Sequence, residues 1–188
     1  MRLWEKIRNI KIGNALRLGQ NASIKVSNAD GSTSTITLNE LKSLDASSRL
    51  VSAGSALTLT QAQHDGKTIL FDTATGSALT LPAATGSGMR IRCVVSVTAT
   101  SGSHSIACVG TDEFAGSLTS IDVDSTDATL AWAAEAADNF DTVTFNRSTT
   151  GLAAVGDWVE LEDIVSGSWN ITGVFRANGT VATPFSAS

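Results

Sequence analysis

The sequence predicts an all-β protein, with an antiparallel β-sandwich or jelly-roll-like domain and short C-terminal tail over residues 51–188, after an extended arm over residues 1–50. Two observations support this fold class. From residue 55 onward, short strand-like runs recur roughly every 8–15 residues between turns rich in Gly, Asp and Ser. Charged residues make up 16% of the chain, below the usual value of about 25%, and small polar residues take their place.

The arm is basic and the rest of the chain is acidic. Residues 1–25 hold six lysines and arginines against Glu5 alone, whereas the remainder holds seven against seventeen carboxylates. The arm either docks on an acidic surface, of a neighbouring protein or of a nucleic acid, or is a solvated end. The acidic body, and Trp4 as the only aromatic residue of the arm, argue against nucleic acid.

The arm also contains two local elements. Residues 23–26 and 34–38 alternate between apolar and polar, and Asp30-Gly31 between them predicts a β-hairpin. Residues 38–44 have apolar residues at helical spacing after a cap at Asn39, which predicts one or two helical turns. Residues 46–54 are expected to be a linker.

Ten strands are expected in the body, and residues 133–137 are expected to form a helical turn. The predicted strands are residues 56–60, 67–71, 78–81, 89–98, 104–109, 118–123, 128–132, 142–145, 158–165 and 169–175.

The last two strands are expected to form a hairpin with a three-residue loop over residues 166–168. This register sets Val159 opposite Phe175, Leu161 opposite Gly173 and Val165 opposite Trp169, and so makes one face almost wholly apolar. Asp163, opposite Ile171, is the exception. A two-residue loop would scatter the apolar side chains over both faces.

The same register sets Trp158 opposite Arg176 on the other face. Trp158 is then either capped by that cation or buried against a neighbouring subunit. Both residues are therefore candidates for a subunit interface.

Cys93 and Cys108 are expected to be free thiols. If residues 100–103 turn a hairpin between them, the two cysteines share a face but lie diagonally, about 7–8 Å apart, which is too far for a disulfide.

Residues 79–92 contain a glycine-rich stretch, Gly86-Ser87-Gly88, between two apolar runs. A phosphate-binding loop needs a lysine and a following helix, but Met89 and Arg90 open a strand-like run instead. We therefore expect the tip of a β-hairpin. Arg90 and Arg92 should point to one side, toward solvent or an interface.

Catalytic and metal-binding patterns are weak throughout. Asp122, Asp124 and Asp127 resemble the start of a calcium loop but lack its glycine and distal glutamate, so we expect an acidic turn and leave weak calcium binding at a subunit junction open. No nucleophile motif occurs, and the chain has two histidines. We expect no enzyme activity and no cofactor. The sequence contains no run of about 18 apolar residues, so we expect no segment that spans a membrane.

Six stretches of the body resemble small virion proteins of tailed bacteriophages. They are residues 57–60, 64–69, 79–88, 142–147, 156–161 and 179–186, so that the resemblance covers roughly residues 55–188. It implies a head decoration (cement) protein: a non-enzymatic homotrimer, made in the host cytoplasm, that binds the major capsid protein on the outer capsid surface at three-fold positions and stabilises the DNA-filled head. The arm would then contact the capsid through Arg2, Trp4, Lys6, Arg8, Lys11 and Arg17.

Two other functions are compatible with such a body. A head or tail fibre adhesion module would bind host glycans or receptors, with exposed aromatic residues such as Trp132 or Phe185 lining the site. A hydrolase of cell-surface polysaccharide would need a pair of carboxylates, and nothing in the sequence selects one.

Overall fold

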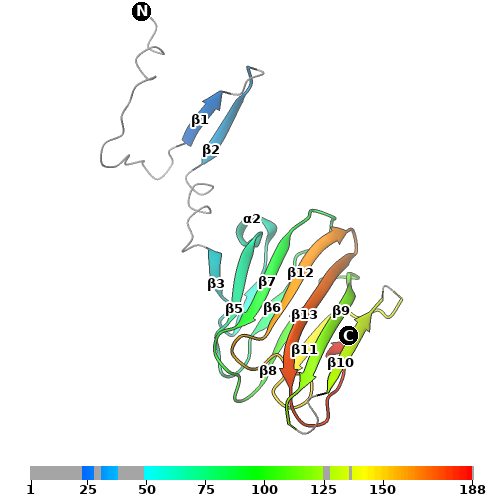
Figure 1. The fold of residues 1–188 in the computed structure, drawn as a ribbon. Coiled ribbons are helices and arrows are strands. Elements are labelled where there is room, and N and C mark those ends of the chain that lie inside the picture. The colour runs from blue at the N-terminus through cyan, green and yellow to red at the C-terminus, as the bar shows by residue number, and fades with distance from the viewer. Residues whose placement is uncertain (1–22, 28–30, 38–48, 125–127, 136, 188) are drawn as a thin grey trace, which may run out of the picture. The chain divides into compact units, whose positions relative to one another are not determined.

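The structure, a computed structural model, describes residues 23–27, 31–37, 49–124, 128–135 and 137–187. The chain divides into two compact units, Met1–Ser48 and Arg49–Ser188, which we call the N-terminal unit and the sandwich unit. Figure 1 shows the elements of both. Each unit is described by itself.

The N-terminal unit contains the predicted hairpin. Strands β1 (Ser23–Ser27) and β2 (Thr33–Thr37) pair antiparallel, with Ser23 opposite Thr37 and Ser27 opposite Thr33. Gly31 adopts a φ of 83°, a value that glycine reaches without steric cost, as a tight turn requires. The helical turn predicted over residues 38–44 lies outside the described residues, as do residues 1–22.

The sandwich unit is nearly all β and contains two sheets with a common core (Figure 1). The seven-stranded sheet has the order β10-β9-β13-β12-β7-β5-β3, and the five-stranded sheet has the order β14-β11-β8-β6-β4. The first sheet comprises β3 (Leu50–Ser52), β5 (Lys67–Phe71), β7 (Arg90–Val95), β9 (Glu113–Asp122), β10 (Thr129–Ala134), β12 (Trp158–Val165) and β13 (Ser168–Ala177). The second comprises β4 (Ala56–Thr58), β6 (Ala78–Thr80), β8 (Ser103–Ala107), β11 (Thr142–Asn146) and β14 (Phe185–Ser186).

The sheets are mixed, so the expectation of an antiparallel sandwich is wrong. From β3 to β9 the chain alternates between the two sheets. Up to β8 each strand pairs with the strand two places along: β3 with β5, β5 with β7, β4 with β6 and β6 with β8. The chain crosses to the other sheet and back between two neighbouring strands of one sheet, so both strands run in the same direction. Strands β3, β5 and β7 are therefore parallel to one another, and so are β4, β6 and β8. Strand β13 also pairs parallel with β9. Periodicity marks a strand but not its partner.

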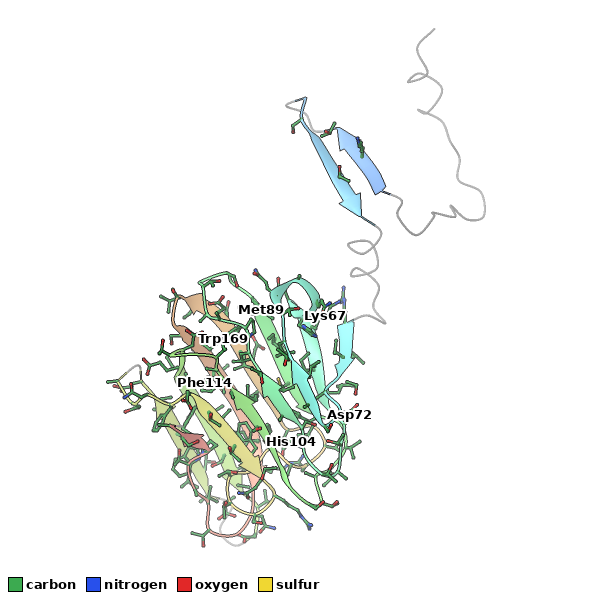
Figure 2. All side chains as sticks on the ribbon, turned by 180° about the vertical axis from the view of Figure 1, so that it is seen from behind. Lys67, Asp72, Met89, His104, Phe114 and Trp169 are labelled. Carbon is green, nitrogen blue, oxygen red and sulfur yellow. The ribbon has the colours of Figure 1, made fainter. Side chains whose placement is uncertain are left out.

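The core lies between the sheets and is filled by alternate residues of each strand. In β7, Ile91 and Cys93 are fully buried while Arg90 and Arg92 are exposed, which confirms the expected alternation. Figure 2 shows Phe114, Trp169 and Met89 among the side chains of this core. Burying one such side chain contributes about 1.5–3 kcal/mol, and this burial is the main stabilisation of the unit.

The hairpin of β12 and β13 combines features of both registers considered above. Its loop has two residues, because Val165 pairs with Ser168, and a bulge between Glu162 and Val165 then shifts the pairing so that Leu161 lies opposite Ile171. The predicted three-residue loop is therefore wrong. The predicted inward face is right for Val159 and Leu161, which are fully buried, and wrong for Val165, which is 54% exposed. The bulge adds one residue to β12. It therefore keeps Val159 and Leu161 on the inward face, as the predicted longer loop would have done.

Two further predicted hairpins are absent. Strands β6 and β7 lie in different sheets, so the glycine-rich stretch is a crossing between sheets and not a hairpin tip. Strands β7 and β8 also lie in different sheets. Cys93 and Cys108 are free as expected, but they do not lie on one hairpin, so the predicted diagonal position is wrong. Burial raises the pKa of both thiols to about 12.

Three smaller expectations are also corrected. Ala133 and Ala134 end strand β10 and do not begin a helical turn. The linker expected over residues 46–54 contains β3. The short helix α2 (Gln61–His64) was not predicted. A hydrogen bond from the Thr60 amide to His64 Nδ1, at 2.9 Å, joins its two ends.

Candidate functional site

The candidate functional surface is the outer face of the seven-stranded sheet, which carries Trp158. The arm residues expected to contact a capsid, from Arg2 to Arg17, lie outside the described residues. Trp158 stands between Val94 of β7 and Val174 of β13, and Leu70 of β5 lies beside Val94. We call Leu70, Val94, Trp158 and Val174 the Trp158 row. Val174 is 39% exposed and the other three are half-buried.

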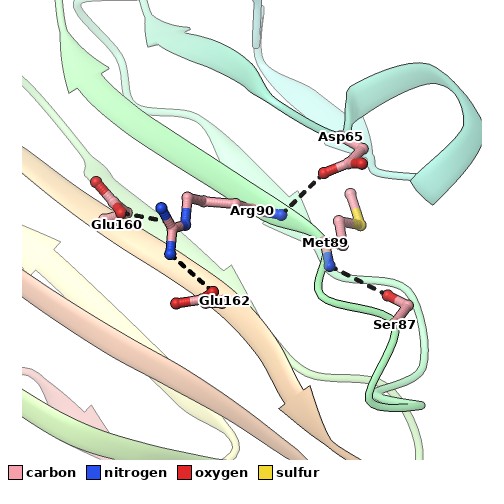
Figure 3. Close-up of polar contacts among 6 residues, drawn as sticks. All are labelled: Asp65, Ser87, Met89, Arg90, Glu160 and Glu162. Carbon is pink, nitrogen blue, oxygen red and sulfur yellow. Dashed lines mark hydrogen bonds and ion pairs between the residues drawn. The ribbon is translucent and has the colours of Figure 1, made fainter.

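A charged row runs beside the Trp158 row on the same face. Arg90 pairs across the strands with Glu162, with Nη2 2.8 Å from Oε1, and its Nε lies 3.6 Å from Glu160 Oε1 (Figure 3). The hydrogen bond that Arg90 donates to Glu162 raises the pKa of Arg90. Because both rows lie on one face of the sheet, this surface combines an apolar strip with a border of ion pairs.

Trp158 is capped by a cation, but the cation is Arg92 and not Arg176. The Arg92 guanidinium lies 4.5 Å from the centre of the indole ring. Arg176 instead donates from Nε to Asp157 Oδ1 at 2.8 Å and from Nη2 to the Val155 carbonyl at 2.7 Å. The expected contact failed because the register differs by two residues from the predicted one, so that Trp158 lies opposite Val174.

The glycine-rich stretch does cradle an anion, and the anion is the protein's own Asp163. The amides of Thr85, Gly86 and Ser87 donate to its carboxylate at 2.8–3.1 Å, and the Ser87 hydroxyl donates at 2.6 Å. Burial alone would raise the pKa of Asp163, but the hydrogen bonds from Ser87, Thr85 and Gly86 lower it to about 2. The loop between the sheets is thereby tied to the bulge of β12.

The acidic turn at the end of β9 forms hydrogen bonds within the chain. The Asp124 amide donates to Asp122 Oδ1 at 3.2 Å, and Asp124 Oδ2 accepts from the Gly179 amide at 2.7 Å. Asp127 lies outside the described residues. Among the residues that the structure describes, no group of three or more His, Cys, Asp or Glu side chains is placed to hold a metal ion.

The two aromatic residues considered for a glycan site, Trp132 and Phe185, are not both exposed to solvent. Phe185 is 4% exposed and stacks on Phe140, with 5.7 Å between ring centres. Trp132 is half-buried, packs against the core and donates from Nε1 to the Ser120 hydroxyl at 3.0 Å. An exposed aromatic platform made by this pair is therefore ruled out.

Sequence reasoning missed two contacts of the surface just described. The cap of Arg92 on Trp158 depends on the pairing of β7 with β12, whose strands are over 60 residues apart in the chain. The cradle of Asp163 depends on the bulge. The one available signal was Asp163 itself, the single carboxylate on an otherwise apolar face.

Comparisons of the chain with family models, with curated proteins and with solved structures found no match. Within the described ranges, no helix has the length and apolar character that crossing a membrane would require.

Proposed function

We propose that this chain is a non-enzymatic structural protein of a bacteriophage virion, a decoration protein on the outer surface of the capsid. The resemblance of residues 55–188 to small phage virion proteins supports the proposal, and so does the sandwich-like architecture. In this function buried contact area stabilises the shell against the outward pressure of packaged DNA. Each Å² of apolar surface removed from water contributes about 25 cal/mol, and the contacts recur over the whole shell.

The observation that carries the proposal is the division of charge between the two units. Residues 1–48 hold seven lysines and arginines against four carboxylates, whereas residues 49–188 hold six against fourteen. A basic unit joined to an acidic one suits an arm that binds an acidic patch of the major capsid protein while the sandwich faces solvent. Unlike charges also speed the encounter of the two surfaces.

We further propose a homotrimer at the three-fold positions, with the Trp158 row in the contact between subunits. An apolar strip with a polar border is the usual composition of such contacts, in which aromatic residues are enriched and the rim stays charged. The ion pairs of Arg90 satisfy the charges beside the strip within one subunit. A partner that covers Trp158 therefore leaves the charge of Arg90 paired, whereas Arg92, which lies over the indole, must stay at the rim or meet a carboxylate of the partner.

Binding of the full-length protein to undecorated capsids tests the proposal. We expect replacement of Arg2, Lys6, Arg8, Lys11 and Arg17 by Gln to abolish co-sedimentation with capsids while the melting temperature stays unchanged. The matched control replaces Arg49 and Arg147, two exposed arginines of the sandwich unit, and should bind as the wild type does. Full decoration by the five-residue variant would contradict the proposal. Electron microscopy of the particle distinguishes a decoration protein, present in hundreds of copies, from a fibre present in few.

A further inference from the structure

One end of the sandwich unit carries a polar hollow of about 450 Å³ between three loops. Its lining includes Ser101, Arg147, Ser148 and Asn178. A second hollow of about 180 Å³ shares Arg147 and Asn178 with the first and adds small apolar side chains such as Ala153 and Ala154. We call the two together the end groove. The larger hollow falls within the size range of small-molecule sites, which is about 300–1,000 Å³.

Two of the three loops are held in place by the body of the unit. The amides of Thr100 and Ser101 both donate to the Ala74 carbonyl, at 2.9 and 3.1 Å. The Gly179 amide donates to Asp124 Oδ2 at 2.7 Å. These walls therefore need no ligand to form.

The loop that carries Arg147 is built around the side chain of Asn146. Asn146 Oδ1 accepts from the amides of Ser148 at 2.8 Å and Thr149 at 2.7 Å, and the Gly151 amide donates to the Asn146 carbonyl at 2.8 Å. The backbone that presents Arg147 is thus fixed before binding, which reduces the entropy that a ligand must offset.

The chemistry of the end groove favours a single negative charge with hydroxyl groups around it. Arg147 is exposed and makes no ion pair with any described residue, whereas Arg176 in the smaller hollow is already neutralised by Asp157. One unpaired guanidinium matches a carboxylate, which it can bind through two parallel hydrogen bonds. Ser101, Ser148 and Asn178 add donors and acceptors for hydroxyls. Among the described residues that line the groove, none is aromatic, so no ring is placed to stack on the face of a neutral sugar.

We propose that the end groove binds a carboxylated saccharide, with the carboxylate of a uronic or sialic acid unit on Arg147 and sugar hydroxyls on Asn178, Ser101 and Ser148. Such a site goes beyond capsid binding, because it would attach the protein to acidic polysaccharide. It uses only residues of the sandwich unit and does not depend on the arm.

Calorimetric titration of the full-length protein with two acidic probes and a neutral one tests the proposal. The probes are a glucuronate-containing tetrasaccharide, sialyllactose and cellotetraose. We expect at least one acidic probe to bind and the neutral one not to bind. Absence of binding by both acidic probes at millimolar concentration, or equal binding of cellotetraose, would overturn the proposal.

Three variants then locate the binding. Arg147→Gln should weaken the binding of the acidic probe about tenfold or more. Arg49→Gln, which removes an exposed arginine outside the groove, should leave that affinity unchanged. Asn178→Ala keeps the net charge and should also weaken binding, which separates a site from general attraction of an anion. Binding that persists in Arg147→Gln, or that falls equally in Arg49→Gln, refutes the assignment. Thermal melting of each variant checks that it is folded.

Discussion

The hydroxyl of Ser87 donates to the carboxylate of Asp163 at 2.6 Å, and this contact joins the loop between the two sheets to the bulge of β12. Three backbone amides complete the cradle, and the Asp163 residue is 1% exposed. A carboxylate with this many donors is bound much as a phosphate is bound in a nucleotide site. Here the arrangement is structural: the charge belongs to the chain itself, and the three amides of the loop donate to it.

We expect Asp163→Asn to lower the free energy of unfolding by about 2–3 kcal/mol. The amide keeps the size of the side chain but loses the charge and one acceptor oxygen, so that buried N–H groups lose their partner. Urea denaturation measures the change. Asp65→Asn is the matched control, because Asp65 is exposed and accepts one hydrogen bond, from the Arg90 amide at 3.0 Å. Equal effects of the two substitutions would contradict a special contribution of the cradle.

A second expectation concerns His104, which is fully buried and stacks on Phe71 with 4.3 Å between ring centres. Its Nδ1 accepts from the Ser77 amide at 3.1 Å, so the neutral ring carries its proton on Nε2, which has no partner among the described residues. Burial lowers the pKa of His104 from its usual 6.5 to about 4.

The unfolded chain therefore binds a proton on His104 between pH 6.5 and about 4 that the folded chain does not bind. Stability should fall as the pH falls through this window, by a few kcal/mol in total. Urea denaturation at several pH values measures the slope. His104→Asn, whose oxygen can still accept from Ser77, should be less stable at pH 7 but should lose less stability on acidification. A wild-type stability that does not change between pH 7 and 4.5 would refute this expectation.

Most of the strands were predictable from the sequence, but of their partners only those within a local hairpin, β1 with β2 and β12 with β13, were predicted correctly. Alternation locates β7 and β12 because it reports which side chains are buried, and this depends only on the residues of each strand. The pairing of β5 with β7 and of β9 with β13 depends on how the chain crosses between sheets, and no local pattern encodes it. The hairpins predicted at residues 86–88 and 100–103 therefore do not exist, because in both places the chain crosses to the other sheet.

The candidate surface was predictable in part for the same reason. Trp158 was placed on the outer face correctly, because the inward positions of β12 were identified correctly. Its partner was misassigned to Arg176, because a bulge changes the register without changing the face. The end groove could not have been predicted, since it joins loops at residues 100–102, 146–148 and 178–179.

Gly151 offers a test of the packing behind the end groove. It adopts a φ of 78°, and an added Cβ would lie 2.5 Å from Phe175 Cδ2 and 2.6 Å from the Arg176 carbonyl oxygen. We expect Gly151→Ala to lower the free energy of unfolding by about 2–4 kcal/mol, because backbone strain and overpacking add. Gly156→Ala is the control: its φ is 94°, but nothing lies within 4 Å of the added Cβ, so that only the strain of about 1 kcal/mol remains. Chemical denaturation of both variants should separate the two costs; equal losses would show that contact with Phe175 contributes nothing.

Trp158→Ala is expected to weaken self-association more than folding. The indole lies on the outer face, half-buried under Arg92, so its removal leaves the core of the sandwich unit intact. If the Trp158 row is the contact between subunits, the loss of its largest apolar side chain should shift sedimentation toward the monomer at concentrations where the wild type is a trimer. Trp132→Ala is the matched control, because Trp132 is also half-buried in this sheet but packs against the core. That variant should melt at a lower temperature and remain associated. An intact trimer of Trp158→Ala, with a melting temperature lowered as in the control, would mean that Trp158 stabilises the subunit and that the contact lies elsewhere.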